Sequence, residues 1–436
     1  YLIKFKKNRN LHDKVEFYIV FTCYTFETKN KIKSLLNKYF SSKEIYLIIN
    51  ALKKINIGSF KLFHQEIKKI NKLKNKQKKI SKSNIDYIAK IYWLIEDCKK
   101  YGSRPFAGLA RCAFISTELI NSLVTKKIIT TKERELFLQS IETLTSKIKK
   151  DYSKNKNSFL KKYGHLRPNT YEISSLNYRD GFSTYFGGKL NKEKFDKKKY
   201  FTFSKIQKQK ITKFLNNENL GITFNQFIFF IKKSIQLREY SKYIFTKSID
   251  MVFDNLKFFA KQFGLREDDL SYLKINKILS MYYNYTTFKN IPDLQKEILY
   301  NKNEFNFNNS IKLPEVILDK SDLFIIENES KVNFIGSQKK NGKILFLNKF
   351  KNSGYDKKIV CIENADPGFD FIFTKKINGL VTKFGGANSH MAIRCAELGI
   401  PAAIGVGEDL FNQIIKSTNI TIDCDRKKII IDGAYN

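Results

Sequence analysis

The stretch that decides the fold is GLVTKFGGANSHMAIRCAELGIPAAIG, residues 379–405. Its first apolar residues, Leu380–Lys383, predict a strand, and the glycine pair Gly385-Gly386 predicts a turn directly after that strand. A helix is expected to begin at Ser389, and a second strand is expected after the proline that follows this helix. A strand, a helix and a strand in this order predict an α/β fold.

The turn and the helix start in this stretch suit a phosphate group. Gly385 and Gly386 let the backbone approach a bulky anion without a clash from a Cβ atom. A helix N-terminus offers unpaired N–H groups and a positive dipole end, which favours a neutral imidazole at His390. A neutral imidazole is the nucleophile that capture of a phosphoryl group needs. We predict that His390 is catalytic and that Gly385, Gly386 and Ser389 bind phosphate; for an isolated Ser-His pair, simple capping of the helix would be the better interpretation.

The whole stretch resembles the signature of the phosphohistidine swivelling domain, which reads roughly GG-x-[ST]-SH-x-AI-x-[AC]-RE-x-G-IP-A. This domain occurs in enzymes similar to phosphoenolpyruvate synthase, pyruvate phosphate dikinase and rifampin phosphotransferase. The residues that carry the resemblance are Gly385, Gly386, Ser389, His390, Ala392, Ile393, Glu397, Gly399, Ile400, Pro401 and Ala402. The resemblance implies that His390 is phosphorylated and then passes the group on. Asn388 and Met391 stand where many members have Thr and Ala, and neither departure affects the nucleophile.

The composition of the chain changes near residue 301. Residues 1–300 carry apolar side chains at helical spacing, and the whole chain has only 6 prolines, so we expect a mainly helical domain here. Residues 301–315 begin with the Asn-rich run NKNEFNFNNS and are expected to form a linker. Residues 316–436 alternate short β-like runs with helical stretches and predict a compact α/β domain. The expected fold class is therefore multidomain α + α/β. The clearest helices are expected at Ile85–Lys99, Phe106–Val124, Lys132–Ile148, Phe227–Phe245 and Ile249–Phe263.

The resemblance also implies a domain order. Only 46 residues follow His390 in the 436-residue chain, which leaves no room for the barrel that synthases and dikinases carry after the swivelling domain. The rifampin phosphotransferase type has an ATP-grasp domain, a helical acceptor domain and then the swivelling domain, and this chain resembles the last two. We expect ATP and Mg²⁺ to act through a missing ATP-grasp domain, with neither bound by this chain itself and no metal ligands in it.

A second motif lies in the helical half, where residues 163–174 read YGHLRPNTYEIS. It resembles an acceptor-domain segment of a subgroup from surface-polysaccharide pathways that includes glutamine kinases, although Asn169 replaces the usual glycine. We predict that His165, Arg167 and Arg104 bind substrate, because the chain has 70 Lys but only 10 Arg and a guanidinium fork is something Lys cannot imitate. The alternative is that these arginines form structural ion pairs with buried carboxylates.

The net charge of +38, from 80 Lys and Arg against 42 Asp and Glu, would suit nucleic acid. However, Arg is scarce, although it is the preferred base-reading residue. Lys, Asn, Ile, Phe and Tyr are all frequent, and they share A/T-rich codons. Residues 316–436 hold 17 basic and 14 acidic residues, net +3, whereas residues 1–315 hold 63 and 28. We therefore expect no specific nucleic-acid partner.

The 6 cysteines form no CxxC pair, which argues against a disulfide scaffold or a zinc ribbon and predicts a cytoplasmic location. No apolar run approaches the roughly 18 residues of a membrane span, so no membrane partner is expected.

The leading hypothesis is the C-terminal part of an ATP-dependent phosphotransferase similar to phosphoenolpyruvate synthase. In it, His390 would carry a phosphoryl group from an ATP-grasp domain, present in cis or in trans, to a small-molecule acceptor. An amide such as glutamine in surface-polysaccharide synthesis is one such acceptor. The alternatives are a non-enzymatic phosphocarrier or regulatory partner, and a basic nucleic-acid-binding protein.

Overall fold

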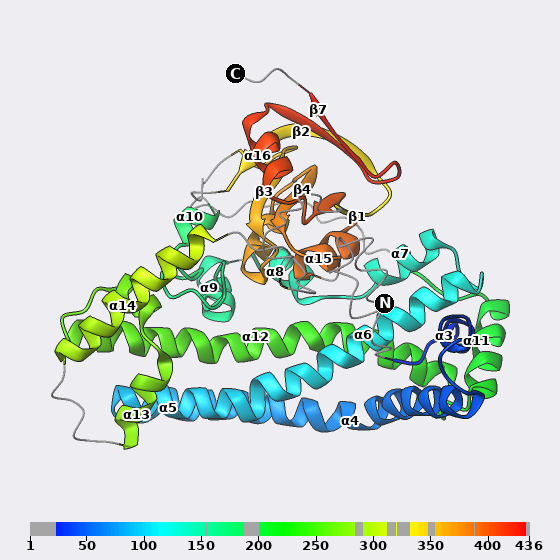
Figure 1. The fold of residues 1–436 in the computed structure, drawn as a ribbon, viewed down its shortest axis with the longest axis horizontal. Coiled ribbons are helices and arrows are strands. Elements are labelled where there is room, and N and C mark those ends of the chain that lie inside the picture. The colour runs from blue at the N-terminus through cyan, green and yellow to red at the C-terminus, as the bar shows by residue number, and fades with distance from the viewer. Residues whose placement is uncertain are drawn as a thin grey trace.

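The computed structural model describes residues 23–152, 155–186, 200–283, 291–311, 320, 332–347, 354–387 and 389–432. These residues form a base of long helices with an α/β unit seated on it (Figure 1). This arrangement confirms the expected fold class, a mainly helical region followed by an α/β region. In the described residues no helix combines the length and the apolar character needed to cross a membrane.

Two helices of about 40 residues dominate the base, α4 (Ser42–Lys82) and α12 (Phe224–Gln262). Each begins with a capping box, at Ser41 and at Thr223, in which the capping side chain and a side chain three residues later satisfy each other's backbone N–H groups. Helix α12 packs against α5 and α6, and α4 packs against α6. The remaining helices of this region are α3 (Thr28–Leu36), α5 (Tyr87–Cys98), η2 (Lys99–Ser103), α6 (Arg104–Thr125), α7 (Thr131–Gln139), α8 (Leu144–Tyr152), α9 (Lys156–Tyr163), α10 (Phe182–Phe186), α11 (Lys205–Asn217), η3 (Glu267–Tyr272), α13 (Ile275–Tyr283) and α14 (Ile291–Ser310).

Three expectations about this region need correction. The two helices expected at residues 227–245 and 249–263 are one continuous helix, α12, because nothing between them breaks the backbone hydrogen bonding. The single helix expected at residues 132–148 is divided into α7 and α8. The Asn-rich residues 301–310, expected to be part of a linker, continue α14 as helix. Residues 312–315, the rest of that expected linker, lie outside the described residues.

The α/β region is a sheet with the strand order β1-β5-β4-β3-β2-β6-β7. Its central strands β2, β3, β4 and β5 pair in parallel, and β1, β6 and β7 pair antiparallel at the two edges. The strands are β1 (Asn333–Ile335), β2 (Lys339–Phe346), β3 (Ile359–Asn364), β4 (Gly379–Phe384), β5 (Ala402–Ile404), β6 (Asn419–Asp423) and β7 (Lys428–Asp432), and the helices are η6 (Pro367–Thr374), α15 (His390–Leu398) and α16 (Glu408–Lys416).

The sheet and the helical region share one hydrophobic core. Aromatic side chains from the segment around α10 pack on Phe371 of η6, with ring centroids 5.2 Å apart for Tyr185 and 6.1 Å apart for Phe186. All three rings are buried. The α/β region is therefore docked on the helices through an apolar interface, and this docking fixes what faces His390.

Candidate functional site

His390 is the first residue of α15, as the sequence predicted. Ser389 is the N-cap, and its hydroxyl accepts a hydrogen bond from the Ala392 N–H at 3.4 Å. The preceding Gly385 has φ of +130°, a conformation that side chains rarely adopt, and a Cβ there would lie 2.8 Å from the Cβ of Ala365. The turn after β4 therefore requires this glycine, and α15 begins with His390, which lines a cavity together with residues of the helical region.

Asp370 of η6 orients the His390 ring. The Nε2 atom of His390 lies 2.8 Å from Oδ1 of Asp370, a carboxylate that is 6% exposed. The Nε atom of Arg394 also lies 3.3 Å from this Nε2 atom. The contact with the ionised carboxylate, which can only accept, is the shorter of the two, so we assign the proton to Nε2 and the lone pair to Nδ1. Burial lowers the pKa of His390, and the charges of Arg394 and Lys242 lower it further, while Asp370 opposes them. The imidazole is therefore neutral at pH 7 and keeps a nucleophilic nitrogen.

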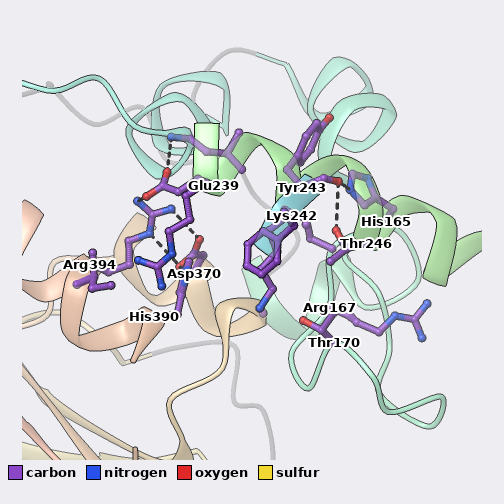
Figure 2. Close-up of a pocket in the computed structure, with 16 residues that line it drawn as sticks. His165, Arg167, Thr170, Glu239, Lys242, Tyr243, Thr246, Asp370, His390 and Arg394 are labelled. Carbon is purple, nitrogen blue, oxygen red and sulfur yellow. Dashed lines mark hydrogen bonds and ion pairs between the residues drawn. The ribbon is translucent and has the colours of Figure 1, made fainter. Parts of the chain in front are cut away.

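Arg394 lies one turn after His390 on α15 and pairs with the acidic groups around it. Its guanidinium is 1% exposed and pairs with Glu239 of α12 and, at 2.8 Å, with Glu397. It also lies 3.7 Å from Asp370. Burial and the neighbouring Glu239 carboxylate raise the pKa of Glu397 to about 7. Because Glu239 belongs to the helical region, this ion pair joins the two regions beside His390 (Figure 2).

A small cavity of about 90 Å³ separates His390 from the helical region, and two cations of α12 line it. Arg238 lies over the Phe114 ring at 5.3 Å, and Lys242 lies between His390 and the residues of the second motif (Figure 2). Neither cation forms a hydrogen bond or an ion pair with another residue that the structure describes. Burial lowers the pKa of both groups. Nearby carboxylates, such as Glu239 for Arg238 and Asp370 for Lys242, act on these cations without forming an ion pair with them. Two partly buried cations that form no direct ion pair make this wall of the cavity complementary to an anion.

His165 lines the same cavity, so the two motifs meet in space although 225 positions separate His165 and His390. Its Nε2 atom lies 2.9 Å from the carbonyl oxygen of Tyr243, which requires a proton on Nε2 and leaves the Nδ1 lone pair free to accept. Burial lowers the pKa of His165 to about 3. The ring is therefore a neutral hydrogen-bonding group in the cavity wall over the physiological pH range.

Arg167 reaches the cavity wall but directs its guanidinium away from His390 (Figure 2). It forms a buried ion pair with Asp250, donates to the Ser175 carbonyl at 3.1 Å and lies over the Phe253 ring at 4.7 Å. Both charged side chains are 4% exposed. This geometry corresponds to the structural alternative, in which the arginine neutralises a buried carboxylate.

The structure does not bring the other predicted residues to the cavity. Arg104 is exposed at the start of α6 and does not line this cavity. Gly385, Gly386 and Ser389 shape the turn before His390, and none of them lines the cavity either. Their role in binding phosphate stays a prediction. It would apply when the α/β region has left the helical region and the N-terminus of α15 faces an ATP-grasp module.

Sequence reasoning missed the residues that surround His390. Asp370 had a detectable signal, because the run Asn364–Gly368 follows a strand and Asp370 comes two residues later. Arg394 had a weak signal, because it is one of only 10 arginines in a chain with 70 lysines. Glu239 and Lys242 had no signal, because helical spacing alone does not tell which face of α12 meets the α/β region.

The residues around His390 do not fit a nucleotide with Mg²⁺. Their carboxylates are engaged by Arg394, and among the described residues no group of three or more His, Cys, Asp or Glu side chains could hold a metal ion. The cavity is also much smaller than the roughly 300–1,000 Å³ typical of small-molecule and cofactor sites.

Comparison with known proteins supports the C-terminal motif. Residues 354–427 match the model of the PEP-utilising enzyme, mobile domain. The chain is 32% identical over 92 residues to a phosphoenolpyruvate synthase of Helicobacter pylori (strain ATCC 700392 / 26695). That match covers 21% of this chain and only 11% of the relative's length. The C-terminal part of this protein therefore contains the phosphohistidine-bearing mobile domain of the PEP-utilising enzymes.

Proposed function

We propose that this chain is the C-terminal part of an ATP-dependent phosphotransferase in which His390 carries a phosphoryl group to a small-molecule acceptor. The observation that carries the proposal is the position of His390 within the mobile domain. A neutral imidazole at a helix N-terminus faces a cavity whose opposite wall holds the cations Lys242 and Arg238. That combination suits a group that is anionic, small and transferred between the two regions.

The first half-reaction loads His390. The lone pair of an imidazole nitrogen attacks a phosphorus atom of ATP, the N–P bond forms, and the P–O bond to the departing nucleotide breaks. Asp370 stabilises the positive charge that develops on the ring. Because the cavity of the docked structure does not fit a nucleotide, loading would occur after the mobile domain moves to an ATP-grasp module, supplied in cis or in trans.

The second half-reaction takes place in the docked arrangement. The acceptor atom attacks phosphorus, the N–P bond breaks with its electron pair returning to the imidazole, and the proton of the acceptor leaves to water. Lys242 and Arg238 would stabilise the charge on the transferring oxygens, and His165 would orient the acceptor by accepting a hydrogen bond. The volume of the cavity favours a compact acceptor group, such as the side-chain amide of glutamine.

A pulse–chase experiment tests this proposal. The chain is loaded with an ATP-grasp module and labelled ATP, the nucleotide is removed, and candidate acceptors are added singly, glutamine first. Lys242→Met should load at the wild-type rate and transfer about 10²–10³-fold more slowly, as for loss of one preorganised charge-stabilising donor.

Lys233→Met is the matched control, because Lys233 is exposed on the same helix and does not line the cavity. Equal transfer rates for Lys242→Met and Lys233→Met would contradict the proposed acceptor site. A loaded chain that passes phosphate to no small molecule, but only to a protein, would instead identify a phosphocarrier.

A further inference from the structure

A tyrosine of the helical region inserts its hydroxyl into the short helix that carries Asp370. Tyr178 is fully buried, and its hydroxyl donates to the Gly368 carbonyl at 3.0 Å and accepts from the Phe371 N–H at 3.1 Å. Residues 368 and 371 are three apart, so their carbonyl and N–H are the pair that a 3₁₀-helix joins directly. The hydroxyl therefore bridges a backbone pair of η6 from outside the α/β region.

This bridge spans the backbone of Asp370, the residue that orients His390. Asp370 lies between the two bridged groups, and its carboxylate accepts from the His390 Nε2–H at 2.8 Å. Any change in the turn between residues 368 and 371 changes the direction of the Asp370 side chain. The conformation of η6 is thus set partly by a residue that belongs to the other region.

Two further observations show that η6 and the helical region are closely packed. A Cβ on Gly368 would lie 1.7 Å from the Arg167 carbonyl oxygen and 2.2 Å from the Pro168 Cα. The Asp366 Oδ1 atom accepts from the Gly368 N–H at 2.7 Å and from the Thr170 hydroxyl at 3.3 Å. The backbone of η6 therefore touches the second motif, the YGHLRPNTYEIS segment, without an intervening side chain.

We propose that Tyr178 is a positioning residue that couples docking of the mobile domain to the orientation of His390. In the docked state, the hydroxyl bridges the turn of η6 and directs Asp370 at the His390 ring. When the domain leaves, residues 368 and 371 lose the hydroxyl and pair with each other or with water, and Asp370 is no longer held in this direction. The effect on phosphoryl transfer rests on the proposed function. The coupling between Tyr178 and the orientation of His390 does not, because it involves only residues of this chain.

The direct test is the imidazole ¹⁵N NMR signal of His390 in unphosphorylated chain with labelled histidine, which is resolvable because the chain has 4 histidines. Wild type should show the Nε2–H tautomer with a strong hydrogen bond. Tyr178→Phe should show loss of that hydrogen bond or exchange between tautomers. Tyr185→Phe is the matched control, because it removes a buried hydroxyl from the same core, one that donates to the Leu176 carbonyl at 2.7 Å.

Gly368→Ala provides a second variant, in case Tyr178→Phe does not fold. The φ of Gly368 is not positive, so alanine fits the α/β region itself, but the added methyl overlaps the Arg167 carbonyl only when the domain is docked. This variant should give the same His390 signal as Tyr178→Phe. A wild-type signal in both variants would overturn the inference.

The consequence for transfer is measured separately. Tyr178→Phe should load His390 normally and transfer about tenfold to hundredfold more slowly, as for loss of a buried pair of hydrogen bonds. If loading and transfer fall together to the extent seen in Tyr185→Phe, Tyr178 is only structural and the inference fails. If no acceptor is found but the tautomer signal changes as expected, the proposed function fails while the coupling stands.

Discussion

At the scale of single residues, the charge of each histidine follows from what surrounds it. Burial alone would leave His390 neutral but free to rotate, and the Asp370 carboxylate fixes the ring and its tautomer. His165 has a backbone carbonyl as its partner, and that hydrogen bond raises its pKa by less than burial lowers it. The two rings of the site are therefore both neutral, but only His390 has an acidic partner that can stabilise a developing imidazolium.

His165 predicts a pH dependence of stability. Its pKa is about 3 in the folded chain against 6.5 ordinarily, so between these values the unfolded chain binds a proton that the folded chain does not. Stability attributable to this group is therefore lost as pH falls below 6.5, by about 1.4 kcal/mol for each pH unit. Between pH 7 and pH 5 the free energy of unfolding should fall in wild type by about 2 kcal/mol more than it falls in His165→Gln. Parallel urea titrations check this, and identical pH slopes would refute the buried state of His165.

Arg167 predicts a different kind of defect from Lys242. Arg167→Ala removes the closest cation from the buried Asp250 carboxylate and leaves it the 3.9 Å contact with the half-exposed Arg179. The variant should therefore destabilise the fold by about 3–5 kcal/mol and impair loading and transfer together. Arg179→Ala removes a guanidinium that is 49% exposed and should cost less than about 1 kcal/mol. Chemical denaturation measures both, and a stable Arg167→Ala with impaired transfer alone would restore a substrate-binding role.

At the scale of elements, the loop of the second motif depends on a left-handed residue. Asn169 has φ of +53°, a region that asparagine tolerates better than other residues with a side chain, so the chain keeps the turn although it lacks the usual glycine. The side chain of Asn169 is exposed, so substitutions there test the backbone and little else.

The prediction for this loop is a matched pair of variants. Asn169→Ala should lower stability by about 1 kcal/mol, and Asn169→Gly should be neutral or slightly stabilising. Thermal melts of the two variants against wild type check the order. Equal melting temperatures for the alanine and glycine variants would show that the loop does not hold the left-handed conformation.

The same elements show what the sequence could predict. The stretch of residues 379–405 encodes its own strand, turn and helix start in local signals, so β4, the Ser389 cap and the place of His390 were predictable. The end of the chain, residues 420–431, was predictable as a hairpin for the same reason, and it forms β6 and β7. The partners of Arg167 and Arg394 were not, because Asp250 and Glu239 lie on α12, far from both arginines in sequence. The first pair forms within the helical region and the second forms where the two regions meet.

At the scale of the whole molecule, the uneven charge bears on the nucleic-acid alternative. The cavity of about 90 Å³ beside His390 is too small for a polynucleotide, so nucleic acid would meet the chain only at its surface. We expect the net charge of +38 to act there as a diffuse field.

Binding of the chain to duplex DNA should consequently be weak, insensitive to sequence and steeply dependent on salt, with the logarithm of affinity falling linearly with the logarithm of salt concentration. Fluorescence anisotropy over a salt series, with two unrelated DNA sequences, checks this. Tight binding near physiological salt with preference for one sequence would favour the nucleic-acid reading instead.

In the proposed reaction, His390 carries the phosphoryl group. The most direct measurement is to incubate the chain with an ATP-grasp module and ATP labelled at both the β- and γ-phosphates, and then to locate the label by peptide mapping. We expect acid-labile, base-stable label on the peptide that contains His390, and none in His390→Ala. Label on His165, or undiminished label in His390→Ala, would contradict it.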